Sequence, residues 1–560
     1  MKVCGIKMTH DAAVAMVEDG KLLFSIELEK LNNNPRYCEM TDLRAVEDVL
    51  AAHGQRVEDV DRFVVDGWHG TGAHWRGEAR LKQKAQGRPI GLEVASYNEL
   101  TLRESILHSK DFDGGLELGG KSYPYSSYMH VAGHVLGTYC ASPFAQRGEP
   151  AYVLAWDGGQ YPRLYWVDPS RRSVQNKGQL FYFLGTIYPI MGHYFGPYAR
   201  SAEQLEADRQ AQDLEGYFGG YETSGKLMAY IAKGRVIADM LAQLPALYQS
   251  ELEIANTFEH RFAGKLRERA TLHGWADADV LLTMHTFLEK MLVDSRSKKI
   301  AKDGVKSPNF CFCGGSALNI KWNSAIRRCG IFKDVWVAPF PNDSGSAIGT
   351  ACCEMFTRGI TALSWSVFSG PLIETGAPVE GWRARKFSLA ELARLLHESG
   401  EPVVFLNGRA ELGPRALGNR SILAAAVSPA MKSLLNKVKR REEFRPVAPI
   451  CLESHAPAIF DPGTPDPFML FDHYVRPDWL TRVPAIKHLD DTARLQTVNE
   501  TDNPAVFELL SAYHQLSGIP LLCNTSANFN GSGFFPDAAS AMRWGQVRYV
   551  YCLDLLYEKT

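Results

Sequence analysis

The sequence lacks the features of exported, membrane-spanning and disulfide-bonded proteins. It has no run of about 18 apolar residues, and the KVCGIKM that follows Met1 is not a basic segment leading into an apolar one. The eleven cysteines are odd in number, and the closest pairs, Cys311/Cys313 and Cys352/Cys353, lack the CxxC spacing of zinc ribbons and redox motifs. We therefore expect a cytoplasmic protein with reduced thiols and no membrane partner.

The chain also has little net charge. Its formal charge of -2 argues against a surface made as a whole for nucleic acid or anionic membrane, and it favours small anionic substrates. At 560 residues and 45% hydrophobic it can form two to four domains of about 150 residues each. Apolar strands alternate with amphipathic helices, which predicts an α/β fold.

Positive charge is concentrated in one window. The stretch GRAELGPRALGNRS, 408–421, follows an apolar run at 403–406 and places Arg409, Arg415 and Arg420 among three glycines and a proline. From 408 to 445 nine Lys and Arg stand against three Glu, an excess of +6. Glycine lets backbone approach a ligand closely, and guanidinium groups pair with phosphate or carboxylate oxygens. This predicts an anion site, with a solvated basic surface as the alternative.

The first residues predict a strand at 2–7 and a hairpin of strands 14–17 and 22–26 joined by Asp19-Gly20. The first loop of this meander holds His10-Asp11. In the fold shared by acetate and sugar kinases, chaperone ATPases and actin, such a hairpin forms the floor of the nucleotide cleft. We therefore expect His10 to point into a cleft, and the alternative is a turn-capping histidine.

Two histidines and two aspartates form a candidate metal site. His130 and His134 are one helical turn apart and project from the same face. Asp157 ends the apolar run AYVLAW, and Asp343 follows VWVAPFPN before a predicted helix. This nitrogen and oxygen set without thiolate favours iron(II), manganese or another divalent metal over structural zinc. Taken alone, the HxxxH pair is also compatible with core or surface histidines.

Glycine-rich turns predict a nucleotide site in the same part of the chain. Strand, paired glycine and helix start is the arrangement that cradles phosphates, although no Walker A or GxGxxG sequence is present. The candidate residues are Gly158, Gly159, Lys226, Gly314, Gly315 and Asn319. The aromatic stretch 181–198 is interpreted as core or as the lining of an acceptor pocket.

A Gly- and Pro-rich segment, 369–382, predicts a linker to a second α/β domain. That domain continues with a helix at 429–438, a basic cluster that includes Lys439 and Arg445, and an apolar strand that ends at Asn524. Two further predictions concern the first domain. Thr41 is expected to cap a helix that stops at Gly54, and 70–125 is expected to be an insertion or loop region.

Together these motifs resemble the O-carbamoyltransferase family that includes nodulation-factor enzymes and the carbamoyltransferases of antibiotic biosynthesis. The resemblance covers the whole chain and is carried by HDAAVAMVEDGK, HVAGH, VLAWDGG, GKLM, GGSALN, PNDSGSAIG, GRAELGPRALGNRS, VKRREEFRPVAP, LQTV and CNTS. It implies an actin-like (ASKHA) N-terminal domain of two α/β subdomains over 1–368. A linker at 369–384 and a smaller YrdC-like α/β domain over 385–560 would follow.

The resemblance also implies a two-step reaction. Carbamoyl phosphate and ATP, accompanied by Mg²⁺, would give carbamoyl adenylate in the C-terminal domain, and the N-terminal domain would pass the carbamoyl group to an alcohol. His130, His134, Asp157 and Asp343 would hold Fe(II), and His10 would lie by the acceptor hydroxyl. Residues implied to bind carbamoyl phosphate and the ATP phosphates are Arg415, Arg420, Ser421, Lys439, Arg445, Arg494 and Asn524.

Several interpretations stay open from sequence. The acceptor is expected to be a small hydroxylated metabolite, sugar or nucleoside, and the alternative is a hydroxymethyl-pyrimidine in a nucleotide or in DNA. A tRNA threonylcarbamoylation-type subunit is disfavoured by the fused second domain and by the lack of a basic arm. A silent nucleotide-binding regulator is disfavoured by the complete metal set, and a hydrogenase-maturation enzyme by the missing CxxC pairs. A homodimer is compatible with the sequence.

The chain departs from the family pattern at two places near its C-terminus. Gly531–Phe535 reads GSGFF where relatives have a GEPIV-like sequence, and LQTV replaces a common PQTV. The segment 70–120 matches the family poorly, so acceptor-specific loops are expected there.

Overall fold

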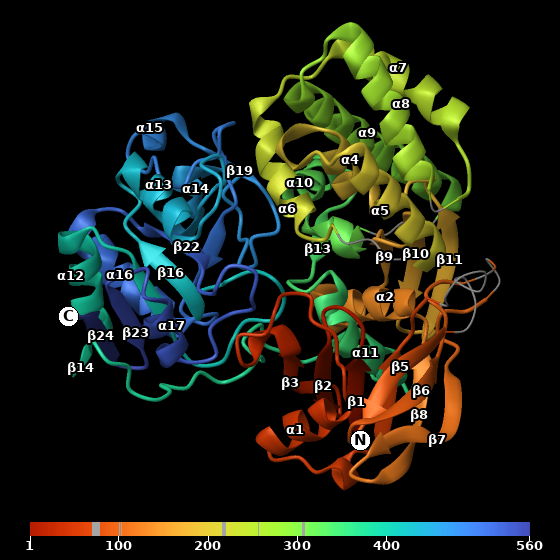
Figure 1. Ribbon diagram of the computed structural model, residues 1–560, viewed down its shortest axis with the longest axis horizontal. Coiled ribbons are helices and arrows are strands. Elements are labelled where there is room, and N and C mark those ends of the chain that lie inside the picture. The colour runs from red at the N-terminus through yellow and green to blue at the C-terminus, as the bar shows by residue number, and fades with distance from the viewer. Residues whose placement is uncertain (70–78, 100, 102–103, 216–219, 256, 305–307) are drawn as a thin grey trace. The chain divides into compact units, whose positions relative to one another are not determined.

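The computed structural model describes all residues except 70–78, 100, 102–103, 216–219, 256 and 305–307 (Figure 1). These residues form two compact units. Unit 1 contains 1–9, 13–23 and 40–365, and unit 2 contains 10–12, 24–39 and 366–560. Two short N-terminal segments therefore belong with the C-terminal half of the chain. The domain limits 1–368, 369–384 and 385–560 stay predictions.

The first sheet of unit 1 has the strand order β3-β2-β1-β4-β8-β7. Strand β1 pairs antiparallel with β2 and parallel with β4, and β4 pairs parallel with β8. The predicted hairpin is confirmed, since Asp19 and Gly20 have φ of 46° and 81°, as a type I′ turn requires. The strands are β1 (Lys2–Lys7), β2 (Ala13–Glu18), β3 (Lys21–Glu27), β4 (Arg62–Asp66), β7 (Lys110–Leu118) and β8 (Lys121–Tyr128).

The second sheet repeats this topology with the order β11-β10-β9-β12-β13. Again the central strand pairs antiparallel with the next strand in sequence and parallel with the one on its other side. Two α/β subdomains with the same strand order confirm the predicted actin-like architecture of this unit. The strands are β9 (Ala151–Ala155), β10 (Arg163–Asp168), β11 (Ser173–Gln179), β12 (Asn309–Cys313) and β13 (Asp334–Val337).

Helices α2 (His130–Cys140) and α11 (Ser346–Thr357) pack against each other at very close range. A Cβ added to Gly349 would lie 2.1 Å from the Gly133 carbonyl oxygen, and one added to Gly137 would lie 2.9 Å from the Gly349 Cα. Only glycine permits this backbone approach. The contact sets the relative position of two helices whose N-terminal ends carry candidate site residues.

Helices fill the chain between β11 and β12 and cover one end of the second sheet (Figure 1). Most aromatic side chains of 181–198 are buried there, among them Phe183 and Phe195 at 0% exposure, which agrees with the core interpretation. The helices are α4 (Ile187–Tyr194), α5 (Ala202–Glu215), α6 (Thr223–Tyr230), α7 (Ala238–Glu251), α8 (Phe258–His273), α9 (Asp277–Asp303) and, after β12, α10 (Ile320–Arg328).

Two local predictions for unit 1 are wrong. Helix α1 spans Arg44–Ala52 and has Leu43, not Thr41, at its N-cap, without a side-chain capping bond. The region expected to be loop contains the hairpin β5 (Ala79–Ala85) and β6 (Arg88–Val94) as well as β7 and β8. Among its described glycines, Gly87 and Gly120 lie in turns and both have φ of 77°, whereas Gly91, Gly114 and Gly115 lie within strands β6 and β7. The predicted role of 70–78 lies outside the described residues.

Unit 2 is built on an eight-stranded mixed sheet with the order β14-β24-β23-β15-β16-β22-β17-β21. The predicted second α/β domain is thus confirmed, whereas its YrdC-like character stays a prediction. The strands are β14 (Trp382–Lys386), β15 (Val403–Leu406), β16 (Arg420–Ala424), β17 (Ala448–Leu452), β21 (Gln496–Val498), β22 (Leu521–Ser526), β23 (Tyr549–Cys552) and β24 (Leu555–Lys559).

Helices pack on this sheet around a large apolar core. The predicted helix 429–438 is confirmed as α13. The helices are α12 (Leu389–Ser399), α13 (Pro429–Val438), α14 (Ala456–Ile459), α15 (Pro477–Leu480), α16 (Pro504–Ser517) and α17 (Ala538–Trp544), and a small sheet is formed by β18 (Phe460–Asp461), β19 (His473–Val475) and β20 (Thr492–Ala493). Unit 1 also has the one-turn helix α3 (Pro143–Gln146). No helix in the described part of either unit has a window long and apolar enough to cross a lipid bilayer.

Candidate functional site

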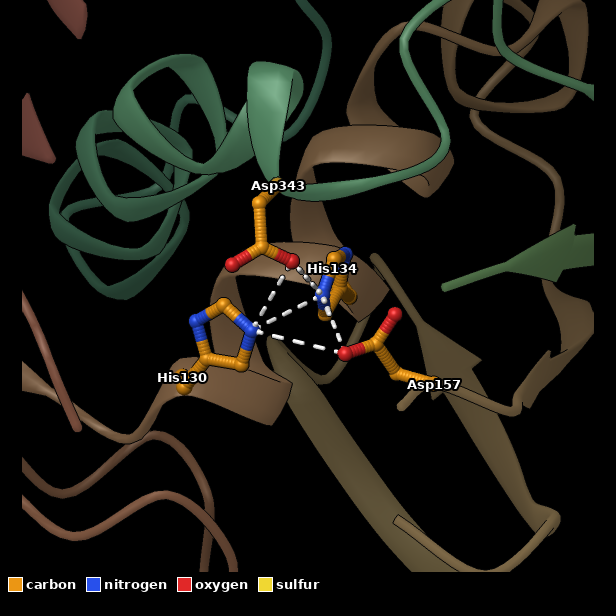
Figure 2. A group of neighbouring side chains, drawn as sticks. All are labelled: His130, His134, Asp157 and Asp343. Carbon is orange, nitrogen blue, oxygen red and sulfur yellow. Dashed lines mark hydrogen bonds and ion pairs between the residues drawn. The ribbon is translucent and has the colours of Figure 1, made fainter. Parts of the chain in front are cut away.

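Four side chains of unit 1 converge on one point (Figure 2). His130 and His134 come from α2, Asp157 follows β9, and Asp343 lies in the turn before α11. The two Nε2 atoms are 3.0 Å apart, and each lies 3.4 Å from Asp343 Oδ1. Asp157 Oδ2 is 3.9 Å from His130 Nε2 and 3.8 Å from His134 Nε2. The four predicted metal ligands are therefore brought together.

The donor set fits a divalent cation. One ligand atom from each residue lies within 4.8 Å of the others, and all four residues are buried. Burial alone would lower the pKa of His130, yet the carboxylates of Asp66 and Asp343 outweigh it and raise that pKa well above its usual value. Surroundings that stabilise a protonated imidazole this strongly also stabilise a bound cation. Two imidazoles and two carboxylates suit iron(II), manganese or another borderline metal.

Asp66 and Lys7 support the ligands from behind. His130 Nδ1 is 2.7 Å from Asp66 Oδ2, which fixes the ring so that Nε2 faces the centre. Lys7 Nζ lies 3.0 Å from both Asp66 Oδ2 and Asp343 Oδ2, and it sits 3.7 Å from the ring centroid of Trp68. The sequence analysis did not identify Lys7 or Asp66 as part of the site. A lysine at the end of an apolar strand could have indicated Lys7.

Asp157 is held in place by two donors. Tyr97 donates its hydroxyl to Asp157 Oδ2 at 2.5 Å, and the Gly315 backbone N–H donates to Asp157 Oδ1 at 2.6 Å. Gly314 has φ of 86°, and a Cβ there would lie 2.4 Å from the Trp156 carbonyl oxygen. The Gly314-Gly315 turn thus positions a candidate metal ligand, a role that the sequence did not indicate.

The other residues of the predicted nucleotide site have the following positions. Gly159 lies against His69, because a Cβ on it would be 2.6 Å from the His69 Nε2 atom. Asn319 caps α10 by accepting the N–H groups of residues 321 and 322. Lys226, on α6, forms an ion pair of 3.1 Å with Glu222, the N-cap residue of that helix. Gly158 follows Asp157 directly, and the nucleotide contacts of the whole set stay a prediction.

The substitution Asp66→Asn tests the support of the metal ligands. The asparagine side chain keeps the shape of the carboxylate but loses the charge that holds the His130 ring, so we expect about 10- to 100-fold weaker metal binding, the usual cost of losing such an outer partner. Metal content after dialysis against graded chelator concentrations measures it. Asp48→Asn, at an exposed position of α1, is the matched control. Equal metal affinity in Asp66→Asn and the control would contradict the assignment.

Unit 2 contains a group of cations at close quarters. Burial, followed by Arg36 and Arg445, lowers the pKa of Arg415 to about 10. Burial and Arg445 likewise lower the pKa of Arg441 to about 9. Burial, followed by three neighbouring arginines, lowers the pKa of Arg494 well below its usual value. Mutual repulsion of this kind shows that the group lacks enough counter-charge.

Several hydrogen-bond donors of this group are available to bind an anion. Arg441 Nε and Nη2 and Arg494 Nε are buried, and they have no hydrogen-bond partner among the residues that the structure describes. Unpaired buried donors are costly, so they mark a place where a ligand supplies the acceptors. Phosphate and carboxylate oxygens match guanidinium donors best. We call Arg36, Arg415, Lys439, Arg441, Arg445 and Arg494 the cationic cluster.

Glu411 organises the loop at 408–421 from inside. Its Oε1 accepts the backbone N–H groups of Leu417, Asn419 and Arg420 at 2.7, 2.7 and 3.1 Å. The Arg420 guanidinium, 1% exposed, donates to the carbonyl oxygens of residues 371, 407, 408 and 419. Arg420 therefore ties the loop together, and its predicted phosphate contact has no support from these bonds.

The remaining predicted anion ligands lie in the same unit. Lys439 Nζ donates to the Asn528 carbonyl at 2.9 Å and to Asn528 Oδ1 at 2.5 Å, and burial followed by Arg441 and Arg36 lowers its pKa well below the usual value. Ser421 Oγ accepts the Gly418 N–H at 3.1 Å. Asn524 Nδ2 donates to Gln496 Oε1 at 2.9 Å, while its buried Oδ1 makes no bond to described residues.

Arg36 joins the cationic cluster from far away in the sequence. Its backbone N–H donates to the Gly531 carbonyl at 2.9 Å, and the Gly533 N–H donates to the Asn34 carbonyl at 3.0 Å. A Cβ on Gly533 would lie 1.9 Å from the Glu29 carbonyl oxygen. The glycines of the GSGFF sequence therefore allow residues 29–36 to pack closely against this part of the chain. Sequence reasoning missed Arg36 and Arg441 as members of the site.

His10 also belongs to unit 2. Its Nδ1 lies 3.1 Å from Asp11 Oδ2, and Asp11 has φ of 57°. An imidazole oriented through Nδ1 in this way would exchange a proton through Nε2. The predicted place of His10 beside an acceptor hydroxyl stays a prediction.

Comparisons with known proteins cover almost the whole chain. Family models described as carbamoyltransferase N-terminus and carbamoyltransferase C-terminus match residues 2–352 and 393–557. Nodulation protein U of Sinorhizobium fredii is 47% identical, covering 100% of this chain and 99% of the relative. The 3'-hydroxymethylcephem-O-carbamoyltransferase of Streptomyces clavuligerus is 31% identical over 100% of this chain and 99% of the relative. Among solved structures, HypF of T. kodakarensis has 13% identity and a TM-score of 0.31 over 64% of this chain and 47% of that one, too low for any conclusion.

Proposed function

This chain belongs to the carbamoyltransferase family, and we propose that it is an ATP-dependent O-carbamoyltransferase that works in two steps at two sites. It is a transferase by its family. The observation that carries the proposal is the pairing, in one chain, of a cationic cluster without enough counter-charge and a buried centre of two histidines and two aspartates.

In the first step, carried out in unit 2 with Mg²⁺, water releases inorganic phosphate from carbamoyl phosphate. The resulting carbamate oxygen attacks the α-phosphorus of ATP, the bond between the α- and β-phosphates breaks, and carbamoyl adenylate forms while pyrophosphate leaves. Two polyanions must meet, and the cationic cluster lowers the cost of bringing their phosphates together. Arg415, Lys439 and Arg494 supply the charge, and Asn524 presents a buried amide oxygen for a donor such as the carbamoyl NH₂. Burial strengthens these interactions relative to water.

In the second step the acceptor oxygen forms a bond to the carbamoyl carbon, and AMP leaves. A bound iron(II) or manganese ion would act as a Lewis acid toward the carbamoyl group. His130, His134, Asp157 and Asp343 would hold this ion. His10 would accept the alcohol proton, since an imidazole changes charge near neutral pH. Carbamoyl adenylate is prone to hydrolysis, so exclusion of water favours transfer.

The acceptor is proposed to be a small hydroxylated molecule. One relative is named 3'-hydroxymethylcephem-O-carbamoyltransferase, and this name supports a primary alcohol on a compact ring system as the kind of acceptor. A sugar, a nucleoside, or a hydroxymethyl-pyrimidine in a nucleotide or in DNA would present similar chemistry. We propose a cytoplasmic enzyme, because ATP and carbamoyl phosphate are intracellular metabolites.

Mass spectrometry over an acceptor panel tests the proposal. We expect one class of acceptor to gain a single CONH₂ group in place of hydrogen, and only when both ATP and carbamoyl phosphate are supplied. The panel contains oligosaccharides, nucleosides, cephem alcohols, hydroxymethylated nucleotides and DNA. A matched reaction with a non-hydrolysable ATP analogue blocked at the α–β bridge is the control. Product formation without ATP would refute the adenylate route.

A further inference from the structure

Lys439 differs from the other buried lysines that the structure describes. Lys7 and Lys30 are each 1% exposed, and Nζ of each lies within 3.0 Å of a carboxylate oxygen. Lys439 is 7% exposed and forms no ion pair with a described residue. Its Nζ bonds instead to two neutral acceptors, the Asn528 carbonyl at 2.9 Å and Asn528 Oδ1 at 2.5 Å. A buried ammonium group without a counter-ion is costly.

The Asn528 side chain is fixed by its own contacts. Its Nδ2 donates to the carbonyl oxygens of Phe529 and Ser532 at 2.7 and 2.9 Å, and Ser526 Oγ donates to its Oδ1 at 2.8 Å. Because the amide nitrogen is engaged with two carbonyls, Oδ1 is the atom that faces Lys439. Ser532 belongs to the GSGFF sequence, so this departure from the family pattern supports the residue that holds Lys439.

The two acceptors of Asn528 match the donors of a neutral amine. An ammonium group has three N–H donors, whereas a neutral amine has two N–H donors and one lone pair. When both N–H groups of the Lys439 amine are donated to Asn528, the lone pair is the position that remains. This lone pair can accept a proton.

Arg441 and Arg36 are the charged groups that act on Lys439 in the described part of unit 2, and both are cations. Burial, followed by these two residues, lowers the pKa of Lys439 well below its usual value. Guanidinium groups hold their proton more tightly than an amine, so Lys439 is the member of the cationic cluster that loses its charge first. Two weaker features favour the ammonium form, the Trp544 ring centroid at 5.9 Å and the position of Lys439 at the C-cap of α13.

We propose that Asn528 positions Lys439 as a neutral amine in the free protein, and that this amine takes up one proton from solvent when a phosphate anion binds to the cationic cluster. The inference rests on the proposed function, because it assigns a proton-linked lysine to the proposed activation site. Without the anion, a neutral lysine removes one charge from a group whose members repel each other. With the anion bound, its negative charge stabilises the ammonium form. Proton and anion therefore each strengthen the binding of the other.

Isothermal titration calorimetry of the full-length protein with carbamoyl phosphate, in the absence of ATP, measures this proton. At pH 7.5 the ligand already carries both of its negative charges, so it exchanges no proton itself. Repeating the titration in buffers of different ionisation enthalpy counts the protons taken up per bound anion. We expect close to one proton, and an affinity that falls by about tenfold between pH 7 and pH 8. Sulfate, which cannot react, is a second probe with the same expectation.

Variants identify the group that takes up the proton. Lys439→Arg keeps a positive charge that does not titrate near neutral pH, so we expect anion binding without proton uptake and with little dependence on pH. Asn528→Asp places a carboxylate against the lysine and keeps it charged in the free protein, so the uptake should also disappear. Lys437→Arg, at an exposed position of α13, is the matched control and should keep the uptake of one proton. Thermal unfolding checks that each variant is folded.

The outcomes separate this inference from the proposed function. Binding of carbamoyl phosphate to the wild-type protein without proton uptake would overturn the inference and leave the proposed function intact. Uptake that persists in folded Lys439→Arg would also overturn it, because the proton would then go to another group. If neither carbamoyl phosphate nor sulfate binds, the cationic cluster is not an anion site, and both the inference and the proposed first step fail.

Discussion

His134→Ala is expected to abolish carbamoyl transfer and to leave carbamoyl adenylate formation near the wild-type rate. The substitution removes one of two imidazoles whose Nε2 atoms face each other at 3.0 Å. The remaining three side chains would hold a divalent metal poorly. Loss of a Lewis acid costs several kcal/mol of transition-state stabilisation, which corresponds to about 10³-fold in rate. Unit 2, where activation is proposed, does not contain this residue.

Two assays on the same preparation separate the steps. Pyrophosphate release with carbamoyl phosphate and ATP in the absence of acceptor reports activation, and carbamoylated product reports transfer. His273→Ala, at an exposed position of α8, is the matched control and should change neither. If His134→Ala lost both activities in equal measure while staying folded, the assignment of the two steps to two sites would be wrong.

Arg494→Met is expected to abolish activation without lowering the stability of the protein. Arg494 is repelled by three neighbouring arginines, and its buried Nε has no partner among the described residues. Methionine keeps much of the volume and removes the uncompensated charge, so the free energy of unfolding should stay equal or rise. The phosphates would lose a charge-assisted partner, and pyrophosphate release should fall by about 10²-fold or more, as with other preorganised donors.

Thermal unfolding with and without carbamoyl phosphate adds an independent readout. A ligand that binds only the folded protein raises its midpoint, so wild-type protein should be stabilised and Arg494→Met much less so. Arg383→Met, at an exposed position of β14, should behave as wild type in both assays. A variant that is clearly less stable than the control, or equally stabilised by carbamoyl phosphate, would show that Arg494 has a structural role instead.

The arginines of the loop at 408–421 have different roles in the structure. The loop at 408–421 was predicted to bind an anion because it carries three arginines, but these arginines do different things. Arg420 uses its donors on four backbone carbonyls, whereas Arg415 lies among the other cations of the cluster. Spacing in the sequence cannot distinguish them, because the choice depends on which carbonyls the fold leaves without partners.

The candidate metal centre was more predictable. His130 and His134 lie one turn apart on a helix, and Asp157 and Asp343 follow apolar strands, so each is placed by its own element. Parallel strands of one sheet end at the same edge, which brings such side chains together. The outer partners were not visible in this way. Lys7 and Asp66 stand on neighbouring parallel strands, and only the pairing of β1 with β4 puts them side by side.

The sequence by itself determined the family, the N-terminal hairpin, the helix at 429–438 and the four candidate metal ligands, because hydrophobic periodicity, turn chemistry and short spacings act within a few residues. Only the tertiary structure decided that residues 24–39 belong with unit 2 and bring Arg36 to the cationic cluster. It also decided that Gly315 serves Asp157 and that Lys439 has Asn528 as its partner. The physical reason is that burial and charge compensation depend on every neighbour in space, and those neighbours come from distant parts of the chain.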